Sequence, residues 1–365
     1  MTFRYSAPGR VNLIGEHTDY NAGFVLPFAI DSRTFVEVSL RDDYKVSVRS
    51  SDIDGSTEIA LSDLKPGVVS DWTAYPLGVV WAMLQTGQGS PRGLNLSLRS
   101  EVPIGAGLSS SAALECAVAV AVNDLWDCKL DRIALAKIGQ QAENQMVGAP
   151  TGIMDQVASM MGARDQAVLI DCQDLSVRNV ALGFEQAGLV LAVIDTKVAH
   201  RHADGGYASR RAACENGAAL MGVKSLRELS EQDLPRAASL LDEVTYRRVK
   251  HVVTENARVL ATVEALESTE PRSIAELMLA SHASMRDDFE ISVDELDCAV
   301  ETAMSLGAVG ARMTGGGFGG SAIALIDADQ LDALRDGVTA EFSKRGFESP
   351  NVFVVQPSDG AGKEN

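Results

Sequence analysis

The chain has 365 residues, room for about two domains, and 46% of them are hydrophobic, which is ample for packed cores. Its formal net charge of −18 argues against nucleic acid and anionic membrane surfaces as main partners, because both repel an acidic protein. A phosphorylated small molecule stays compatible with this charge, since it needs positive potential only at its own site.

Cysteine content and hydropathy predict the compartment. The chain has five cysteines, an odd number, with no C-x-x-C spacing, which predicts free thiols in a reducing environment. The first residues do not form a signal peptide, and the longest apolar run, residues 116–122, is too short to span a bilayer. We therefore expect a cytoplasmic protein without membrane contact, and a monomer, because nothing in the sequence argues for an oligomer.

The first half of the chain favours strands. Segments rich in β-branched or aromatic residues, and one alternating segment, predict strands over residues 24–30, 34–40, 45–49, 94–98, 168–171 and 189–195. Helical spacing predicts helices over residues 71–84, 111–126 and 130–146. A break near residues 172–188 suggests one unit over residues 1–183 and a second over residues 184–365.

The second half favours helices. Residues 210–303 are mostly helical in pattern, with serines at several expected helix starts. Two late strands, 322–326 and 351–355, enclose a helix over residues 329–345. Residues 358–365 are expected to form a loose tail.

The segment of residues 9–20, here called the polar motif, places four polar groups around a short apolar stretch: Arg10, Glu16, His17 and Asp19. Many convergent donors and acceptors suit a small, hydroxyl-rich molecule such as a sugar. The alternative is a solvated turn after a strand.

The glycine–serine loop, residues 105–111, directly precedes a predicted apolar helix. Glycines let a backbone approach a ligand closely, serines can cap the helix, and a helix N-terminus favours an anion. The loop is therefore a candidate phosphate cradle, formed by Gly105, Ala106, Gly107, Leu108, Ser109, Ser110 and Ser111. It is not a P-loop, and an ordinary loop before a capped helix is the alternative.

The glycine cluster, residues 315–320, has five glycines in six residues and formally matches G-x-G-x-x-G. A dinucleotide-binding fingerprint lies between a strand and a helix, whereas a strand is predicted after this cluster. We therefore reject the dinucleotide interpretation and expect backbone packed closely against another loop or a ligand.

Three acidic or metal-binding candidates follow. Asp155 stands at the start of an apolar stretch, after a sharp turn. This position suits a catalytic carboxylate, and a helix-capping Asp is the alternative. Glu143 could join Ser111 in holding Mg²⁺, although alone it suits a surface carboxylate. Residues 200–204, His-Arg-His-Ala-Asp, favour a polar loop over a metal site, because no other His or Cys cluster completes a tetrahedral set.

At these residues the chain resembles the galactokinase family of GHMP small-molecule kinases. The polar motif, the glycine–serine loop followed by Ala112, and the glycine cluster carry the resemblance, and residues 71–78 and 357–361 extend it over nearly the whole chain. It implies an α/β (α+β) fold of two lobes with mixed sheets and the active site in the cleft between them. It also implies transfer of a phosphoryl group from ATP to the anomeric hydroxyl of galactose.

Carried over by position, the resemblance implies a role for each residue. Asp155 would be the base or hydrogen-bond acceptor for the anomeric hydroxyl, and Arg10 would stabilise charge beside it. The glycine–serine loop would wrap the ATP phosphates, Trp72 would lie near the adenine, and Mg²⁺ would be held by Ser111 and Glu143. The sugar hydroxyls would be held by Glu16, His17, Asp19, Gly152 and Tyr207.

Two alternatives stay open. A sensor that binds galactose and ATP without catalysis would lack residues just after the loop serines, but Ser110-Ser111-Ala112-Ala113 is uninterrupted. A related kinase for N-acetylgalactosamine, galacturonate, mevalonate or homoserine is the second, and the polar motif disfavours the last two. Many galactokinases carry an additional segment before this motif, and only six residues precede its Ala-Pro-Gly-Arg here.

Overall fold

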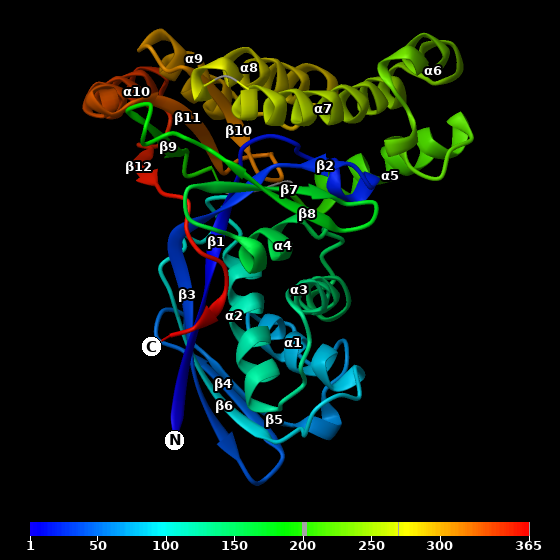
Figure 1. The fold of residues 1–365 in the computed structure, drawn as a ribbon, viewed down its shortest axis with the longest axis vertical. Helices are drawn as coiled ribbons and strands as arrows, with labels where there is room; N and C mark the ends of the chain where they lie inside the picture. The colour runs from blue at the N-terminus through cyan, green and yellow to red at the C-terminus, as the bar shows by residue number, and fades with distance from the viewer. Residues whose placement is uncertain (199–202, 269, 365) are drawn as a thin grey trace.

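The computed structural model describes residues 1–198, 203–268 and 270–364, which form two α/β lobes joined along the middle of the molecule (Figure 1). The lobe with the N-terminus contains a six-stranded mixed sheet, in which only β4 and β6 pair in parallel. The strands lie in the order β13 (Gly362–Lys363), β1 (Thr2–Asn12), β3 (Pro27–Arg41), β6 (Gly93–Ser100), β4 (Lys45–Ser50) and β5 (Ser56–Ala60).

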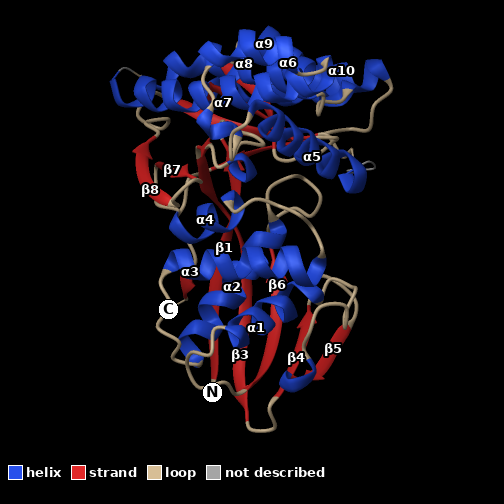
Figure 2. Ribbon diagram, turned by 90° about the vertical axis from the view of Figure 1, so that its right-hand side faces the viewer, coloured by secondary structure: helices blue, strands red, loops and turns tan. Residues whose placement is uncertain are grey.

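Helices cover one face of this sheet (Figure 2). They are α1 (Ala74–Gln85), α2 (Ser110–Leu125), α3 (Arg132–Gln141) and α4 (Met154–Met161). The helix α2 packs directly on β1 and β3, and its buried face is made of small residues, chiefly alanine and valine, which allow this close approach. Its N-terminus is thereby brought beside the segment that follows β1.

The second lobe pairs a four-stranded antiparallel sheet with most of the later helices. The strand order is β10 (Gly310–Thr314), β11 (Ser321–Asp327), β9 (Leu189–Asp195) and β12 (Asn351–Val355). The helices are α5 (Ala203–Met221), α6 (Leu234–Leu240), α7 (Glu243–Ser268), α8 (Ala275–Ser284), α9 (Asp294–Ser305) and α10 (Leu331–Arg345). A small sheet of β2 (Phe24–Val25), β7 (Gln166–Asp171) and β8 (Ser176–Ala181) lies between the lobes.

Strand β9 explains how the lobes share a core. Successive side chains of a strand point to opposite faces. Ala192 and Ile194 accordingly pack into the core under the later helices, whereas Leu191 and Val193 pack into a core shared with β1 and β3. A continuous apolar strand is therefore buried on both faces, as its sequence predicted.

Most predicted elements are present, with shifted ends. The predicted strands 24–30 and 34–40 are instead the short β2 and one long strand, β3, which pairs with β1 and β6. The predicted helix 130–146 is α3 followed by a π-helical segment, Ala142–Val147. All five cysteines are free thiols, as predicted. None of the helices in the described ranges combines the length and hydropathy of a membrane-crossing segment.

The expectation of a loose C-terminal tail is wrong. β13 pairs with β1, and Ala361 is buried. The Ser358 N–H donates to the Ala29 carbonyl at 2.8 Å, and the Gly360 N–H donates to the Gly162 carbonyl at 2.8 Å. The polar tail is ordered because its backbone groups find partners on β3 and at the end of α4, which no local pattern reveals.

Candidate active site

A cavity of about 730 Å³ lies where the two lobes meet. It is lined by the polar motif, the glycine–serine loop, the turn before α4, the start of α5 and the glycine cluster. These five segments are far apart in sequence; composition singled out four of them, and the family resemblance alone indicated Tyr207 at the start of α5. The fold therefore gathers the predicted site residues around one space of small-molecule size.

A bulge in β1 aims Arg10 at this cavity. The pairing of β1 with β3 shifts register between Pro8 and Arg10. A side chain at Gly9 would lie 2.7 Å from the Leu108 carbonyl oxygen, so only glycine permits this approach. The Arg10 N–H then donates to the same carbonyl at 3.1 Å. Bulges often redirect a side chain next to an active site, and this one joins the polar motif to the glycine–serine loop.

Arg10 and Asp155 form a two-pronged ion pair. Nε of Arg10 donates to Oδ1 of Asp155 at 2.7 Å, and Nη2 donates to Oδ2 at 2.8 Å. Nη1 donates to the Gly107 carbonyl at 2.7 Å. The Arg10 side chain is 6% exposed and that of Asp155 is 28% exposed, so the carboxylate is the member of the pair that faces the cavity. A fork of this kind fixes direction as well as charge.

The glycine–serine loop differs from the predicted capped helix. Ser109 occupies the N-cap position of α2 in a left-handed conformation, with φ of 58°, and its side chain makes no cap hydrogen bond. Its hydroxyl donates instead to Asp155. The first N–H groups of α2 lack partners within the helix, as in any helix, so this end of the cavity favours an anion.

The glycine cluster closes over this loop, as predicted from its composition. It connects the antiparallel strands β10 and β11, which confirms that it is not a dinucleotide fingerprint. A side chain at Gly315 would lie 3.1 Å from the Gly107 carbonyl oxygen. Ser321 donates its hydroxyl hydrogen to the Ala106 carbonyl at 2.6 Å. The two lobes therefore touch backbone to backbone at the rim of the cavity.

Glu143 is not a surface carboxylate. It is buried, and Ser111 donates to its Oε1 at 3.1 Å, while Thr151 and Gln156 donate to its Oε2 at 2.8 and 2.9 Å. Burial and the charge of Asp155 raise the pKa of Glu143. Ser111 and Glu143 place two oxygen ligands side by side at the cavity wall, which fits a Mg²⁺ ion that keeps waters and phosphate oxygens as its other ligands.

The Asp19 carboxylate occupies space that is open only because residue 152 is glycine. A side chain at Gly152 would lie 1.7 Å from Oδ2 of Asp19, so only glycine leaves room for this carboxylate. Burial and the nearby charge of Asp155 raise the pKa of Asp19 to about 6, although the backbone N–H groups of Tyr20 and Met154 favour its charged form. Two carboxylates thus face the same space from opposite segments.

His17 is neutral and enclosed by aromatic rings. Burial, with the charge of His251, lowers its pKa to about 3. Its Nε2–H donates to the Gly316 carbonyl at 3.2 Å, so its Nδ1 accepts from the Tyr20 hydroxyl at 2.8 Å. The ring centroid of Tyr207 lies 5.0 Å away. Both ring nitrogens are therefore used within the protein, and Tyr207 lines the cavity beside this ring.

Trp72 lies elsewhere. Its Nε1–H donates to the Asp54 carbonyl at 3.1 Å, and it is not among the described residues that line the cavity, so its contact with adenine stays a prediction. Residues 199–202, which include His200 and His202, lie outside the described residues, as do the side chains of residues 203–205. Within the described ranges, no group of three or more His, Cys, Asp or Glu side chains is arranged to hold a metal.

Sequence reasoning missed several lining residues. Tyr75 and Val147 line the cavity, and Gln156 joins Glu143 to the buried carboxylate of Glu115. Gln156 stands next to Asp155, and this adjacency was the one signal that could have indicated it. The aromatic and aliphatic residues look like ordinary core residues in the sequence.

Comparison with known proteins now decides the family. Residues 2–40 match the model of the galactokinase galactose-binding signature, residues 74–163 match the GHMP kinases N-terminal domain, and residues 262–344 match the GHMP kinases C-terminal model. A galactokinase of Streptomyces coelicolor is 50% identical over 360 residues, which cover 98% of this chain and 93% of that protein. The chain belongs to the galactokinase family.

Other relatives agree with this membership. A galactokinase of Mycobacterium bovis is 45% identical, with 99% of both chains covered. The crystal structure of Lactococcus lactis galactokinase complexed with galactose superposes with a TM-score of 0.95 at 33% identity, covering 100% of this chain and 95% of that one. A mevalonate kinase structure, at 18% identity and a TM-score of 0.69, shares the fold. The two-lobed galactokinase fold is as the sequence implied, and the six-stranded sheet of the first lobe is the mixed one.

Proposed function

We propose that this protein transfers the γ-phosphoryl group of ATP to the anomeric hydroxyl of galactose, giving galactose 1-phosphate and ADP. The observation that carries this is the Arg10–Asp155 pair, which faces a cavity bounded by a sugar-type polar motif and an anion-favouring helix end. Membership of the galactokinase family supports the same reaction.

Asp155 accepts the proton of the attacking hydroxyl. Its Oδ1 and Oδ2 are fixed by Arg10, and Ser109 also donates to Oδ2, so the carboxylate cannot turn away from the cavity. Arg10 lies against Asp155 and offsets negative charge as the phosphoryl group moves. A positioned base of this type contributes roughly 10²–10⁴-fold to a rate.

The phosphates of ATP lie along the glycine–serine loop and at the N-terminus of α2. Gly105 and Gly107 have φ of 77° and 75°, so the backbone of this loop takes a path that side-chain-bearing residues rarely adopt. Phosphoryl transfer depends mainly on positioning and on neutralising charge, and backbone N–H groups supply both without a P-loop lysine.

Ser111 and Glu143, which both line this cavity, would hold Mg²⁺. When bound, Mg²⁺ supplies charge neutralisation to the phosphates. Thr151 and Gln156 hold the Glu143 carboxylate from behind, so its Oε1 stays beside the Ser111 hydroxyl at 3.1 Å.

Galactose lies between the polar motif and the turn before α4. Asp19 accepts sugar hydroxyls, Gly152 leaves the space, Tyr207 and His17 form one wall, and Glu16 supplies a further carboxylate at the cavity surface. The proposal also includes action as a cytoplasmic monomer.

Two other functions make different predictions. A non-catalytic sensor is disfavoured because the residues after the loop serines form an unbroken helix, α2, that starts at Ser110. A kinase for another small molecule is disfavoured because residues 2–40 match a galactose-binding signature.

The test is ADP formation by the purified protein with Mg-ATP and a panel of galactose, glucose, N-acetylgalactosamine, galacturonate and mevalonate. Turnover with galactose far above the others is expected. Galactose binding without ADP release would contradict the kinase in favour of a sensor. Faster turnover of another panel member would reassign the substrate.

A further inference from the structure

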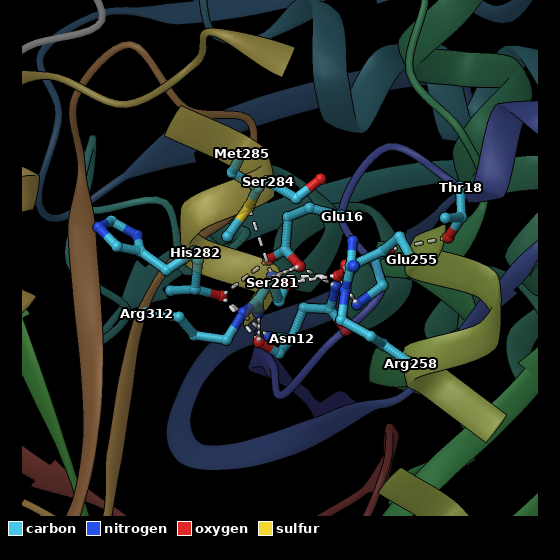
Figure 3. A network of polar contacts seen from close by, with 12 residues as sticks. Asn12, Glu16, Thr18, Glu255, Arg258, Ser281, His282, Ser284, Met285 and Arg312 are labelled. Atoms are coloured by element: carbon cyan, nitrogen blue, oxygen red, sulfur yellow. Dashed lines mark hydrogen bonds and ion pairs between the residues drawn. The ribbon is translucent and has the colours of Figure 1, made fainter. Parts of the chain in front are cut away.

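Beneath the polar motif lies a network of buried charges from the second lobe (Figure 3). Glu16 meets Arg312 of β10, and Arg312 meets Glu255 of α7, which in turn pairs with Arg258. Arg312, Glu16 and Glu255 are each at most 1% exposed. Two carboxylates face two guanidinium groups, so the network is balanced, and loss of one member would leave a buried charge without its partner.

The Glu16 carboxylate is already held by the protein. Its Oε2 accepts from Nδ2 of Asn12 at 2.7 Å and from Nη2 of Arg312 at 2.6 Å. Its Oε1 accepts from the Gly315 N–H at 2.9 Å, with the Thr314 hydroxyl 3.2 Å away. A carboxylate offers about four acceptor sites, so the protein sets the orientation of Glu16 before any sugar arrives.

Arg312 also holds the backbone that leads into the polar motif's acidic residues. Its Nη1 donates to the carbonyls of Asn12 and Leu13, each at 3.1 Å, while its Nη2 reaches Glu16. These carbonyls stand at the end of β1, which is Asn12. A planar guanidinium presents several donors in one fixed fork, which the single ammonium of a lysine cannot do.

Residues of α7 also hold the backbone of the polar motif. The Gly15 N–H donates to Oε1 of Glu255 at 3.0 Å, and Nε2–H of His251 donates to the Glu16 carbonyl at 3.2 Å. Gly15 has φ of 106° and His17 has φ of 62°. Positive φ at a residue other than glycine is uncommon, and it persists where surrounding contacts over-determine it.

We propose that Arg312 is a positioning residue for sugar binding: it orients Glu16 and fixes the backbone between β1 and Gly15, and so sets the affinity for galactose from below the cavity floor. Arg312 does not line the cavity. This inference rests on the proposed galactose site. One arginine of the second lobe thus positions the polar motif of the first lobe.

The test compares Arg312→Lys with the unchanged protein, using calorimetry to measure the dissociation constants of galactose and of ATP separately. Arg33→Lys is the matched control, because Arg33 also donates to two backbone carbonyls, those of Asp359 and Gly360, but at the C-terminal tail. Because Arg312→Lys loses one hydrogen bond to a charged group, its dissociation constant for galactose should be about tenfold higher than that of the unchanged protein. The ATP constant, and both constants of Arg33→Lys, should stay within about twofold.

A second comparison separates positioning from general loosening. If Arg312 acts through Glu16, Arg312→Lys should add little to Glu16→Gln, because contacting residues couple and distant ones add. Additive losses, an equal rise in both dissociation constants, or no change in galactose affinity would each overturn the inference. Should Arg312→Lys not fold, Ser281→Ala carries the same test, since Ser281 bonds to both Arg312 and Glu255; unchanged galactose affinity would overturn it there.

The two proposals fail in different ways. An unchanged protein that binds no galactose contradicts the proposed function. An unchanged protein that binds galactose, with Arg312→Lys binding it equally well, contradicts only the role of Arg312.

Discussion

Gly152→Ala should remove most of the affinity for galactose while leaving the backbone unstrained. Gly152 does not have a positive φ, so alanine can adopt its backbone conformation. The added Cβ, however, would lie 1.7 Å from Oδ2 and 2.2 Å from Cγ of Asp19. The effect of this substitution therefore acts through the position of one carboxylate.

The magnitude follows from that distance. Ordinary contact begins near 3.4 Å, so the Asp19 carboxylate must retreat by about 1.5 Å or more, which is too far to keep a hydrogen bond of normal length. Loss of a hydrogen bond to a charged group costs about 1.5–3 kcal/mol. The dissociation constant of galactose should therefore rise about 10- to 150-fold.

Calorimetry of galactose binding is the assay, with Gly362→Ala as the matched control. A Cβ at Gly362 meets nothing within 4 Å, and its φ is also not positive. In an Asp19→Ala background the obstruction is gone, so Gly152→Ala should then change affinity little. Galactose affinity within about threefold of the unchanged protein would refute the reasoning, and so would an equal loss in both backgrounds.

Three further predictions concern catalysis, pH and the tail. Asp155→Asn should lower turnover roughly 10²–10⁴-fold with little change in Tm, and near-normal ADP release would reject Asp155 as the base. Burial and the charge of Asp155 raise the pKa of Asp19 to about 6. Galactose should therefore bind tightly at pH values above 6, where Asp19 is ionised, and its affinity should fall as the pH drops below 6. Calorimetry between about pH 5 and 8 measures this, and a flat profile would count against an ionised Asp19 in the sugar site. Gly360→Ala places a Cβ 2.4 Å from the Met160 carbonyl oxygen, so Tm should fall by several degrees; an unchanged Tm would mean that the tail is not coupled to α4.

The sequence predicted the residues that line the site better than the residues that hold them in position. The polar motif, the glycine–serine loop and the glycine cluster have compositions that ordinary strands and helices avoid, and all three line the cavity. Asp155 was identified by the turn before it. Such signals are local, so a single sequence contains them.

The features that the sequence did not predict depend on contacts between distant segments. Arg312 is one arginine in a short strand, and nothing near it indicates Glu16, almost 300 residues earlier. The loop serines were expected to be able to cap the helix, but Ser109, at the N-cap position of α2, donates its hydroxyl hydrogen to the carboxylate of Asp155. The polar tail looked loose because its partners, Ala29 and Gly162, belong to other elements. Strand β3 runs through charged residues because β1 and β6 pair with it on both sides.

The most direct test of the central claim is the identity of the phosphorylated product. Asp155 and Arg10 are assigned to the anomeric hydroxyl, so phosphorus NMR of the reaction with galactose and Mg-ATP should show an anomeric sugar phosphate, formed in step with ADP. That signal should vanish with Asp155→Asn. A phosphate ester at another carbon of galactose, or ADP release with no sugar phosphate, would contradict the assignment.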